Sequence, residues 1–352
     1  MNAIINRIAP PASMPRSPNQ RAWARFKRNR LGYASLWIFA AMLLVSAVAE
    51  LLSNDRPLAA RYHGEWSFPA LGNPPETHYG GDFLTPTDWS DPLIAQRFAE
   101  PGNWALHTFN RHSANSLDYS ANQADPAPPS ARSWLGTDAV GHDMVARLLY
   151  GFRVSILFAF ALTAIGTSIG VALGAMQGFF GGRLDLTTQR LIEIWSSIPE
   201  LYLLIIFASI FQPSLLLLLV LLSLFGWIGL SDYVRAEFLR NRSLEFVKAA
   251  RALGLSSGQI IWRHLLPNSL TPVITFLPFR MSAAILSLVA LDFLGLGVPA
   301  NIPSLGELVR QGKSNLDAWW IIFPTFGLLV VTLLLLTFIG DALRDAFDTR
   351  KS

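Results

Sequence analysis

Three ionisable residues lie in or beside long apolar stretches of this chain, where they could bind a charged solute. Arg280 lies near the middle of stretch 269–291, Glu193 near the start of stretch 189–211, and Asp292 directly after residue 291. Charged side chains are costly in hydrocarbon, so they usually face protein or a water-filled path. All three could line a substrate path, with Arg280 binding carboxylates. The alternative, slightly favoured by the sequence, is an internal ion pair of Arg280 with Glu193 or Asp292.

Motifs for enzyme chemistry are missing from the sequence. No G-x-S-x-G occurs, the six histidines show no HExxH or other paired zinc spacing, and no two carboxylates form a recognisable acid and base couple. Residues 306–314, GELVRQGKS, resemble a phosphate-binding loop, but five residues separate its glycines where the Walker pattern requires four. The sequence therefore predicts no catalytic residue, no metal site and no cofactor on this chain.

The charged segment Glu245–Pro267, here named the elbow segment, has the pattern of two helices joined by a sharp turn. Residues 249–250 are alanines, which are strong helix formers, and Gly254 can adopt the left-handed conformation that ends a helix. Ser256 or Ser257 can then cap a second helix. A solvated amphipathic surface helix would have a similar composition.

The overall composition indicates a membrane protein. The 352 residues are 51% hydrophobic and only 15% charged, which is too apolar for an ordinary soluble domain. Six stretches reach or nearly reach the roughly 20 residues that a helix needs to cross the hydrocarbon core. These stretches are 31–52, 152–178, 189–211, 214–231, 269–291 and 319–340. We therefore predict an all-α membrane protein with six transmembrane helices, of which 31–52 is an uncleaved anchor.

Positive charge is concentrated before the first span. Residues 1–30 hold seven Lys or Arg and no Asp or Glu, which places the N-terminus in the cytoplasm. Six crossings return the C-terminus, 344–352, to the same side, together with the basic segment 232–268. The pI near 9.6 reflects anchoring at the anionic membrane lipid of the inner leaflet and requires no nucleic-acid partner.

Residues 53–135 differ in composition from the rest of the chain. They hold ten prolines and many aromatic residues, without helical periodicity over any long window. This pattern predicts an irregular or short-stranded insertion outside the membrane, and the content of Trp and Tyr argues against disorder. Two roles stay open for it: contact with a soluble binding protein or peptide substrate, and a structural lid over the helices.

Five glycines recur at every fourth position through the second span and into the next loop. On a helix this spacing makes one continuous face that lets neighbouring backbones approach closely in lipid. We therefore predict a packing surface, within the chain or with a partner subunit, formed by Gly166, Gly170, Gly174, Gly178 and Gly182.

The elbow segment also resembles the signature of ABC-importer permeases, E-A-A, three residues, G, nine residues, I, one residue, L-P. Two positions depart from this order, since Lys248 stands where the family usually has Glu and His264 where it usually has Ile. Glu245, three residues before Lys248 on the same helical face, could supply the missing carboxylate. In that family the segment couples the permease to its ATPase. The matching residues are Ala249, Ala250, Gly254, Leu266 and Pro267.

Other motifs extend the resemblance to nearly the whole chain. Those shared with dipeptide and oligopeptide permeases lie at 134–151, 293–297 and 340–348, and residues 22–26, 35–39 and the Trp-rich insertion are similar to permeases of microcin C and oligopeptide importers. The resemblance implies a type I importer permease of the bacterial inner membrane, with a core of five helices at 136–343 and a cytoplasmic coupling segment at 232–268.

The resemblance further implies partners that this chain lacks. They are a second homologous permease subunit, an ATPase with two nucleotide-binding domains that bind ATP and Mg²⁺, and a periplasmic binding protein that delivers the peptide. Transport would proceed by alternating access, and the chain itself would not be an enzyme. The alternatives are a permease of an ABC exporter, which would have no binding protein, and a membrane enzyme or channel, which would need no ATPase.

Overall fold

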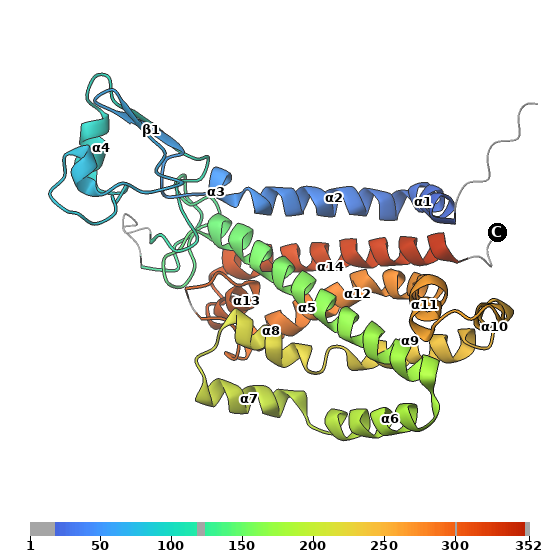
Figure 1. Cartoon of the computed structure of the whole chain (residues 1–352). Coiled ribbons are helices and arrows are strands. Elements are labelled where there is room, and N and C mark those ends of the chain that lie inside the picture. The colour runs from blue at the N-terminus through green and yellow to red at the C-terminus, as the bar shows by residue number, and fades with distance from the viewer. Residues whose placement is uncertain (1–17, 118–123, 300, 349–352) are drawn as a thin grey trace, which may run out of the picture.

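Long helices run side by side through most of the chain, and a small unit with three strands lies at one end of them (Figure 1). The structure, a computed structural model, describes residues 18–117, 124–299 and 301–348. The chain is mostly helical, as predicted. Its longer helices are α1 Pro18–Arg28, α2 Arg30–Ala47, α5 Met144–Phe180, α6 Gly182–Ser196, α7 Glu200–Ile210, α8 Leu215–Ser223, α9 Ile228–Asn241, α12 Leu266–Phe293, α13 Leu305–Ser314 and α14 Trp319–Phe347.

Five helical segments of the described residues are long and apolar enough to cross a membrane, and a bent pair, α6 with α7, makes a sixth. The prediction of one continuous helix at 189–211 is therefore wrong, because the two helices meet at an angle of 62°. The break falls at Pro199, which has no N–H to donate. Just before it, the hydroxyls of Ser196 and Ser197 donate to the carbonyls of Ile192 and Ile194.

The fourth predicted span, 214–231, is also interrupted. Helix α8 ends at Ser223, residues 224–227 form a turn, and α9 continues the same span well beyond residue 231. The carbonyl of Leu224 in this turn accepts hydrogen bonds from the indole nitrogens of Trp195, at 3.0 Å, and Trp227, at 2.8 Å. The turn therefore leaves backbone carbonyls free for side chains inside the membrane region.

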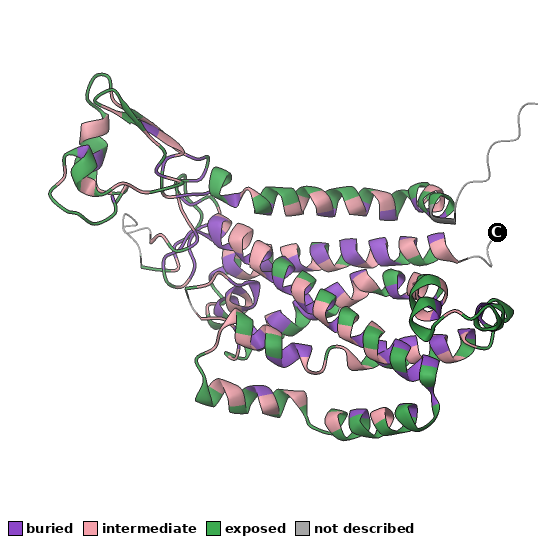
Figure 2. Ribbon diagram, viewed as in Figure 1, coloured by how far each residue is buried: buried purple, intermediate pink, exposed green. Residues whose placement is uncertain are grey.

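Helix α5 lies at the centre of the bundle and packs against α8, α9 and α12, while α14 packs against α2, α12 and α13. Buried residues mark α5 and α14 in Figure 2, whereas α6 and α7 are mostly exposed or half-buried. The core joins residues such as Phe152 and Ile156 of α5 to Ile285 and Leu288 of α12.

The first and last long helices lie against each other. Phe26 of α1 is buried with Ala342 and Ala346 of α14. Arg25 donates to the carbonyl of Asp348 at 3.0 Å. Gly32 of α2 lies so close to α14 that an added Cβ would collide with the side chain of Ala342.

The glycine face of α5 packs against α9 and the turn before it. A Cβ added to Gly170 would lie 2.9 Å from the carbonyl oxygen of Trp227, and one added to Gly178 would lie 2.6 Å from that of Arg235. Gly182 is not part of this face, because α5 ends at Phe180 and a Cβ on Gly182 would meet nothing within 4 Å. Gly182 instead begins α6, with a φ of +57° that favours glycine.

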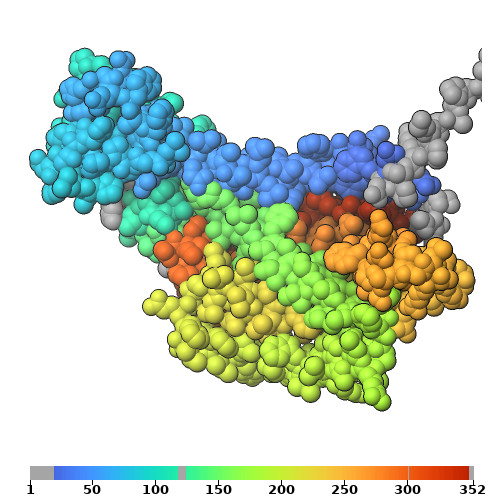
Figure 3. Space-filling view, in the orientation of Figure 1, coloured from blue at the N-terminus to red at the C-terminus, as the bar shows by residue number. Residues whose placement is uncertain are grey.

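The insertion after the first span is ordered around a small sheet. Strands β1 Ala59–Tyr62, β2 Glu65–Ser67 and β3 Trp104–Leu106 pair antiparallel in the order β2-β1-β3. The 3-10 helix η1 Glu76–Tyr79 and helix α4 Pro92–Phe98 bring Tyr79, Trp89 and Phe98 into mutual ring contact beside Tyr62. Figure 3 shows this unit projecting beyond the helices at one end of the molecule.

Candidate functional site

The elbow segment lies at the end of the molecule opposite the insertion (Figure 1). It contains α10 Glu245–Ala252, α11 Ser257–Ile260 and the π-helical turn η2 Ile261–Leu265, which leads directly into α12. In Figure 3 its orange surface projects from the bundle. Helix α1 and the C-terminal end of α14 lie at the same end.

Two local motifs fix the turn between α10 and α11. Gly254 has a φ of +78°, and the N–H groups of Gly254 and Leu255 donate to the carbonyls of Arg251 at 3.0 Å and Ala250 at 3.2 Å. This is the Schellman arrangement, which requires a left-handed residue at the helix end. Ser256 then caps α11 through a capping box with Gln259. The helix, turn and helix expected from the sequence are therefore present.

Buried residues anchor one side of the elbow segment to the bundle. Val247, Ala250 and Ile260 are buried together with Phe238 of α9. The guanidinium of Arg251 lies 5.4 Å from the ring centre of Phe179, at the end of α5. The segment is thus held to α5 and α9, the two helices that meet along the glycine face.

The opposite side of the elbow segment is exposed and partly apolar. Leu253 is 79% exposed and Trp262 is 71% exposed, so the part of the chain that the structure describes leaves both side chains largely uncovered. Between them runs a backbone whose shape is set by the Schellman motif and the capping box. Large apolar side chains on a rigid, projecting segment are suited to insertion into a groove of another protein.

The residues that the sequence predicted for coupling lie on both the buried and the exposed side of the elbow segment. Glu245 and Lys248 form an exposed ion pair at 2.8 Å, so the carboxylate of Glu245 is engaged beside Lys248. Ala250 belongs to the buried side, and His264 and Leu266 are half-buried. Ala249, Gly254 and Pro267 are exposed. Sequence reasoning did not single out Leu253 or Trp262, because a lone apolar residue in a helix gives no sign of whether it is exposed.

An ion pair between Arg235 of α9 and Asp185 of α6, here named the clasp, joins α6 to the end of the bundle that carries the elbow segment. Arg235 of α9 makes two hydrogen bonds with the carboxylate of Asp185 in α6, at 2.5 and 2.7 Å. The amide of Gln177 in α5 donates to Ser231 of α9 at 3.2 Å, within the buried part of the contact. Movement of α9 would therefore carry both α6 and the elbow segment with it.

The expected ion pair of Arg280 is not formed. The guanidinium donates to the carbonyl of Gly226 at 2.7 Å, and within the described ranges no carboxylate lies within 4 Å of it. Glu193 is exposed on α6 and pairs with Arg190 at 2.5 Å. Asp292 is buried, where it accepts hydrogen bonds from Ser304 and from the N–H of Val298. The three residues predicted to share one path therefore lie in separate environments.

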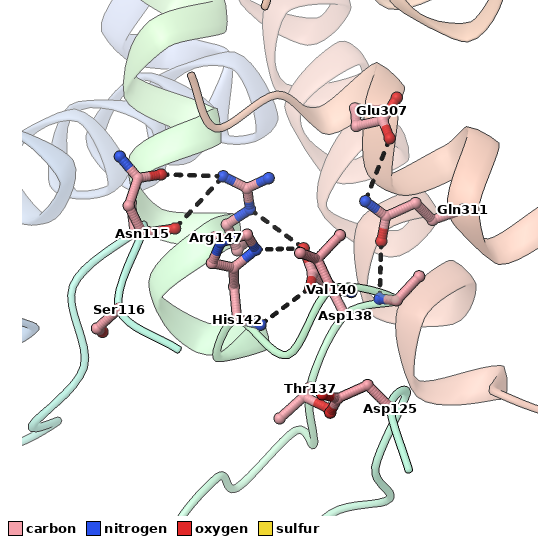
Figure 4. A network of polar contacts seen from close by, with 12 residues as sticks. Asn115, Ser116, Asp125, Thr137, Asp138, Val140, His142, Arg147, Glu307 and Gln311 are labelled. Atoms are coloured by element: carbon pink, nitrogen blue, oxygen red, sulfur yellow. Dashed lines mark hydrogen bonds and ion pairs between the residues drawn. The ribbon is translucent and has the colours of Figure 1, made fainter. Parts of the chain in front are cut away.

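A buried polar network closes the N-terminal end of α5 (Figure 4). Asp138 accepts hydrogen bonds from the N–H of His142 at 2.9 Å and from its ring at 3.0 Å, and it lies 3.4 Å from Nε of Arg147. Arg147 also donates to the carbonyl of Ala114 at 3.3 Å. Burial alone would raise the pKa of Asp138, but the hydrogen bonds from His142 hold that pKa below its usual value.

The network fixes the insertion to the membrane helices. Asn115 approaches Arg147 from the loop that ends the insertion, and Gln311 of α13 accepts from the N–H of Ala139 at 3.0 Å. The hydroxyl of Tyr150 in α5 donates to the carbonyl of Ser53, where the insertion begins, at 2.8 Å. The residues that resembled a phosphate-binding loop form helix α13, whose Gly306 packs against α12.

The bent and broken membrane helices, with a projecting elbow segment between α9 and α12, define a permease subunit of an ABC importer. Residues 170–352 match the model of the family described as binding-protein-dependent transport system inner membrane component. Residues 17–64 match the N-terminal TM domain of oligopeptide transport permease C. The chain therefore belongs to the family of binding-protein-dependent transport system inner membrane components.

Individual relatives cover nearly the whole chain. It is 48% identical over 334 residues to the inner membrane ABC transporter permease protein YejE of Escherichia coli, covering 95% of this chain and 98% of that protein. It is 44% identical to the peptidoglycan transport system permease protein YejE of Agrobacterium fabrum, over 95% and 93% of the two chains. It is 31% identical to the dipeptide transport system permease protein DppC of Lactococcus lactis, over 95% and 91%.

Proposed function

We propose that this chain is the permease subunit of an ATP-driven importer that carries peptides across the inner membrane. The names of its relatives support a peptide substrate, since they include dipeptide, oligopeptide and peptidoglycan transport systems. Peptides released from peptidoglycan fit this class, and so do microcin C-like peptide antibiotics, which the similarity of the N-terminal half favours. In this function the chain works with a second permease subunit and receives its substrate from a periplasmic binding protein.

The elbow segment is the observation that carries the proposal. Its exposed Leu253 and Trp262 would enter a groove on a separate ATPase, which binds ATP and Mg²⁺. Because the buried side of the segment is held to α5 and α9, a displacement of the segment would be passed to these helices. A channel or membrane enzyme would have no use for such a surface.

The different features at the two ends of the molecule support the proposed direction of transport. Basic residues precede the first span on the side of the elbow segment, which indicates the cytoplasm for that end and for both termini. The ordered insertion at the other end would then face the periplasm, where it is placed to contact a binding protein. An exporter would have no binding protein to contact there.

Transport follows from alternating access. Closure of the two nucleotide-binding domains on ATP would draw the elbow segments of the two permease subunits together. Helices α5 and α9 would move with the elbow segment, while the clasp between Arg235 and Asp185 would carry α6 along. Such rocking opens a central site to one side of the membrane at a time.

Substitution of Gly254 tests the coupling role. Gly254→Leu places a branched side chain in the left-handed region, at a cost of roughly 1–2 kcal/mol, and should distort the turn. Gly254→Asn should be tolerated, because Asn adopts this conformation more readily. Gly258→Ala is the matched control, since Gly258 is exposed in the same segment and lacks a positive φ.

The measurements are ATPase activity stimulated by the binding protein and peptide uptake in proteoliposomes that contain the whole complex. Gly254→Leu should lower both sharply, while Gly254→Asn and Gly258→Ala stay near wild type. Wild-type activity of a fully incorporated Gly254→Leu complex would contradict the coupling role.

A further inference from the structure

Arg280 is a cation in the middle of a membrane helix whose partner is a carbonyl group. It lies on α12, about 18 Å along the helix axis from Asp292. Its Nη2 atom donates to the carbonyl of Gly226 in the turn between α8 and α9. One carbonyl oxygen carries only a partial negative charge, and residues 18–117, 124–299 and 301–348 offer the guanidinium no ionised partner at this depth.

Within the part of the chain that the structure describes, buried polar atoms of α12, α5 and α8 also lack hydrogen-bond partners. The Nε atom of Arg280 is buried and has no hydrogen bond. On α5, the hydroxyls of Thr163 and Thr167 are also buried without a hydrogen bond, and these residues lie on either side of Gly166 in the sequence. The hydroxyl of Ser223, at the end of α8, is buried without a partner as well. Buried polar groups in folded proteins are nearly always hydrogen-bonded to protein or water, so groups without a partner in the chain mark places where water or a ligand can bind.

The backbone makes room for the guanidinium. A Cβ on Gly166 would lie 2.8 Å from Nη2 of Arg280 and 3.1 Å from the carbonyl oxygen of Gly226. Glycine at residue 166 thus leaves room beside α5 for the guanidinium of Arg280 to reach the carbonyl of Gly226. Substrate sites of transporters lie near the bilayer midplane, where a membrane helix is discontinuous. The turn at residues 224–227 is such a discontinuity.

We propose that Arg280 binds a carboxylate of the transported peptide at this midpoint, an inference that rests on the proposed function. The guanidinium has five N–H groups in a planar fork, which matches the two oxygens of a carboxylate. Gly226 occupies one of these donors and holds the side chain in place. Thr163, one turn before Gly166 on α5, and Ser223, three residues before Gly226, have further hydroxyls on the two elements that contact Arg280.

Equilibrium binding to the purified permease and ATPase complex, prepared without binding protein, tests this site. The probe is one fluorescent tripeptide made with a free C-terminal carboxylate and again as the C-terminal amide, each measured with a non-hydrolysable ATP analogue. The wild-type complex should bind the free acid more tightly than the amide. Arg280→Gln should weaken binding of the acid at least about tenfold and leave binding of the amide unchanged.

Two further variants separate recognition from folding. Arg280→Lys keeps the charge without the planar fork, so it should retain part of the preference for the acid even if Arg280→Gln does not assemble. Arg190→Gln removes an exposed arginine of α6 and should change neither affinity.

Several outcomes would overturn the site: no binding by the wild-type complex, equal binding of acid and amide, or an equal loss of both in Arg280→Gln. Peptide uptake by the wild-type complex with its binding protein checks the proposed function separately, because it does not depend on which residue holds the carboxylate.

Discussion

Gly174 provides the sharpest test of the packing between α5 and α9. A Cβ at this position would collide with the carbonyl oxygen of Ser231 and lie 2.9 Å from Cβ of Val234 and 3.0 Å from the backbone nitrogen of Arg235. Two of these three atoms are backbone atoms of a helix, so a change of rotamer cannot relieve the contact. Helix α9 as a whole would have to move away from α5.

The size of the effect follows from two opposing terms. Overpacking a well-packed site costs about 1–3 kcal/mol, while replacing glycine in a helix by alanine recovers about 1 kcal/mol. Gly174→Ala should therefore be close to neutral or destabilising by up to about 2 kcal/mol. Gly174→Leu adds three more carbon atoms to the same contact and should be clearly destabilising. Gly327→Ala, in α14 with nothing within 4 Å, should be stabilising.

Stability can be measured as thermal unfolding of the purified chain in detergent, with the yield of folded protein from the membrane as a second reading. The order of stability should be Gly327→Ala, wild type, Gly174→Ala, Gly174→Leu. If Gly174→Leu unfolds like the wild type, then α9 does not lie against α5 as described. A defect seen only in the complex would show that the glycine face binds the partner subunit.

Two further predictions concern the polar network around Asp138 and the orientation of the chain in the membrane. Because the pKa of Asp138 is lowered on folding, its carboxylate stabilises the network above the ordinary pKa of about 3.9, and this contribution is lost as the pH falls through the lower folded value. Asp138→Asn should lower the free energy of unfolding by roughly 3–5 kcal/mol at pH 7 and remove this acid dependence. Asp88→Asn, at an exposed site, is the control and should change neither the stability nor its pH dependence. Thermal unfolding at pH 7 and below pH 4 measures both. The natural chain has no cysteine, so an impermeant thiol reagent applied to intact cells should label Asp88→Cys and not Ala249→Cys; the reverse pattern would invert the proposed orientation.

The residues that end one helix and cap the next were enough to predict the shape of the elbow segment from the sequence. Gly254 and Ser256 act on the backbone of their immediate neighbours, so their effect does not depend on the rest of the fold. The glycine spacing likewise indicated a close helix contact, but it could not identify α9 as the partner. Gly182 extended the spacing by chance, because the preceding Gly181 had already ended α5.

Features that depend on tertiary structure were missed. The apolar residues on both sides of Pro199 made one stretch, and hydropathy does not register a bend. The sequence suggested carboxylates as partners of Arg280 because it shows which side chains are acidic. It does not show which backbone carbonyls are available, and the carbonyl of Gly226 becomes available only through the turn after α8. The sequence predicted an irregular or short-stranded insertion but not the bounds of its strands, because strands of three or four residues are too short to show an alternating pattern.

The contact of α2 with α14 has a consequence for the biosynthesis of the chain. Among the described helices, α2 leaves the ribosome early and α14 leaves it last, and Gly32 of α2 lies against Ala342 of α14. At about 5–20 residues per second, the anchor helix waits roughly 15–60 s in the bilayer before its partner is made. During that time lipid must cover its inner face. A chain whose translation stops before α14 would leave that face without this partner, and quality-control proteases could recognise the uncovered face.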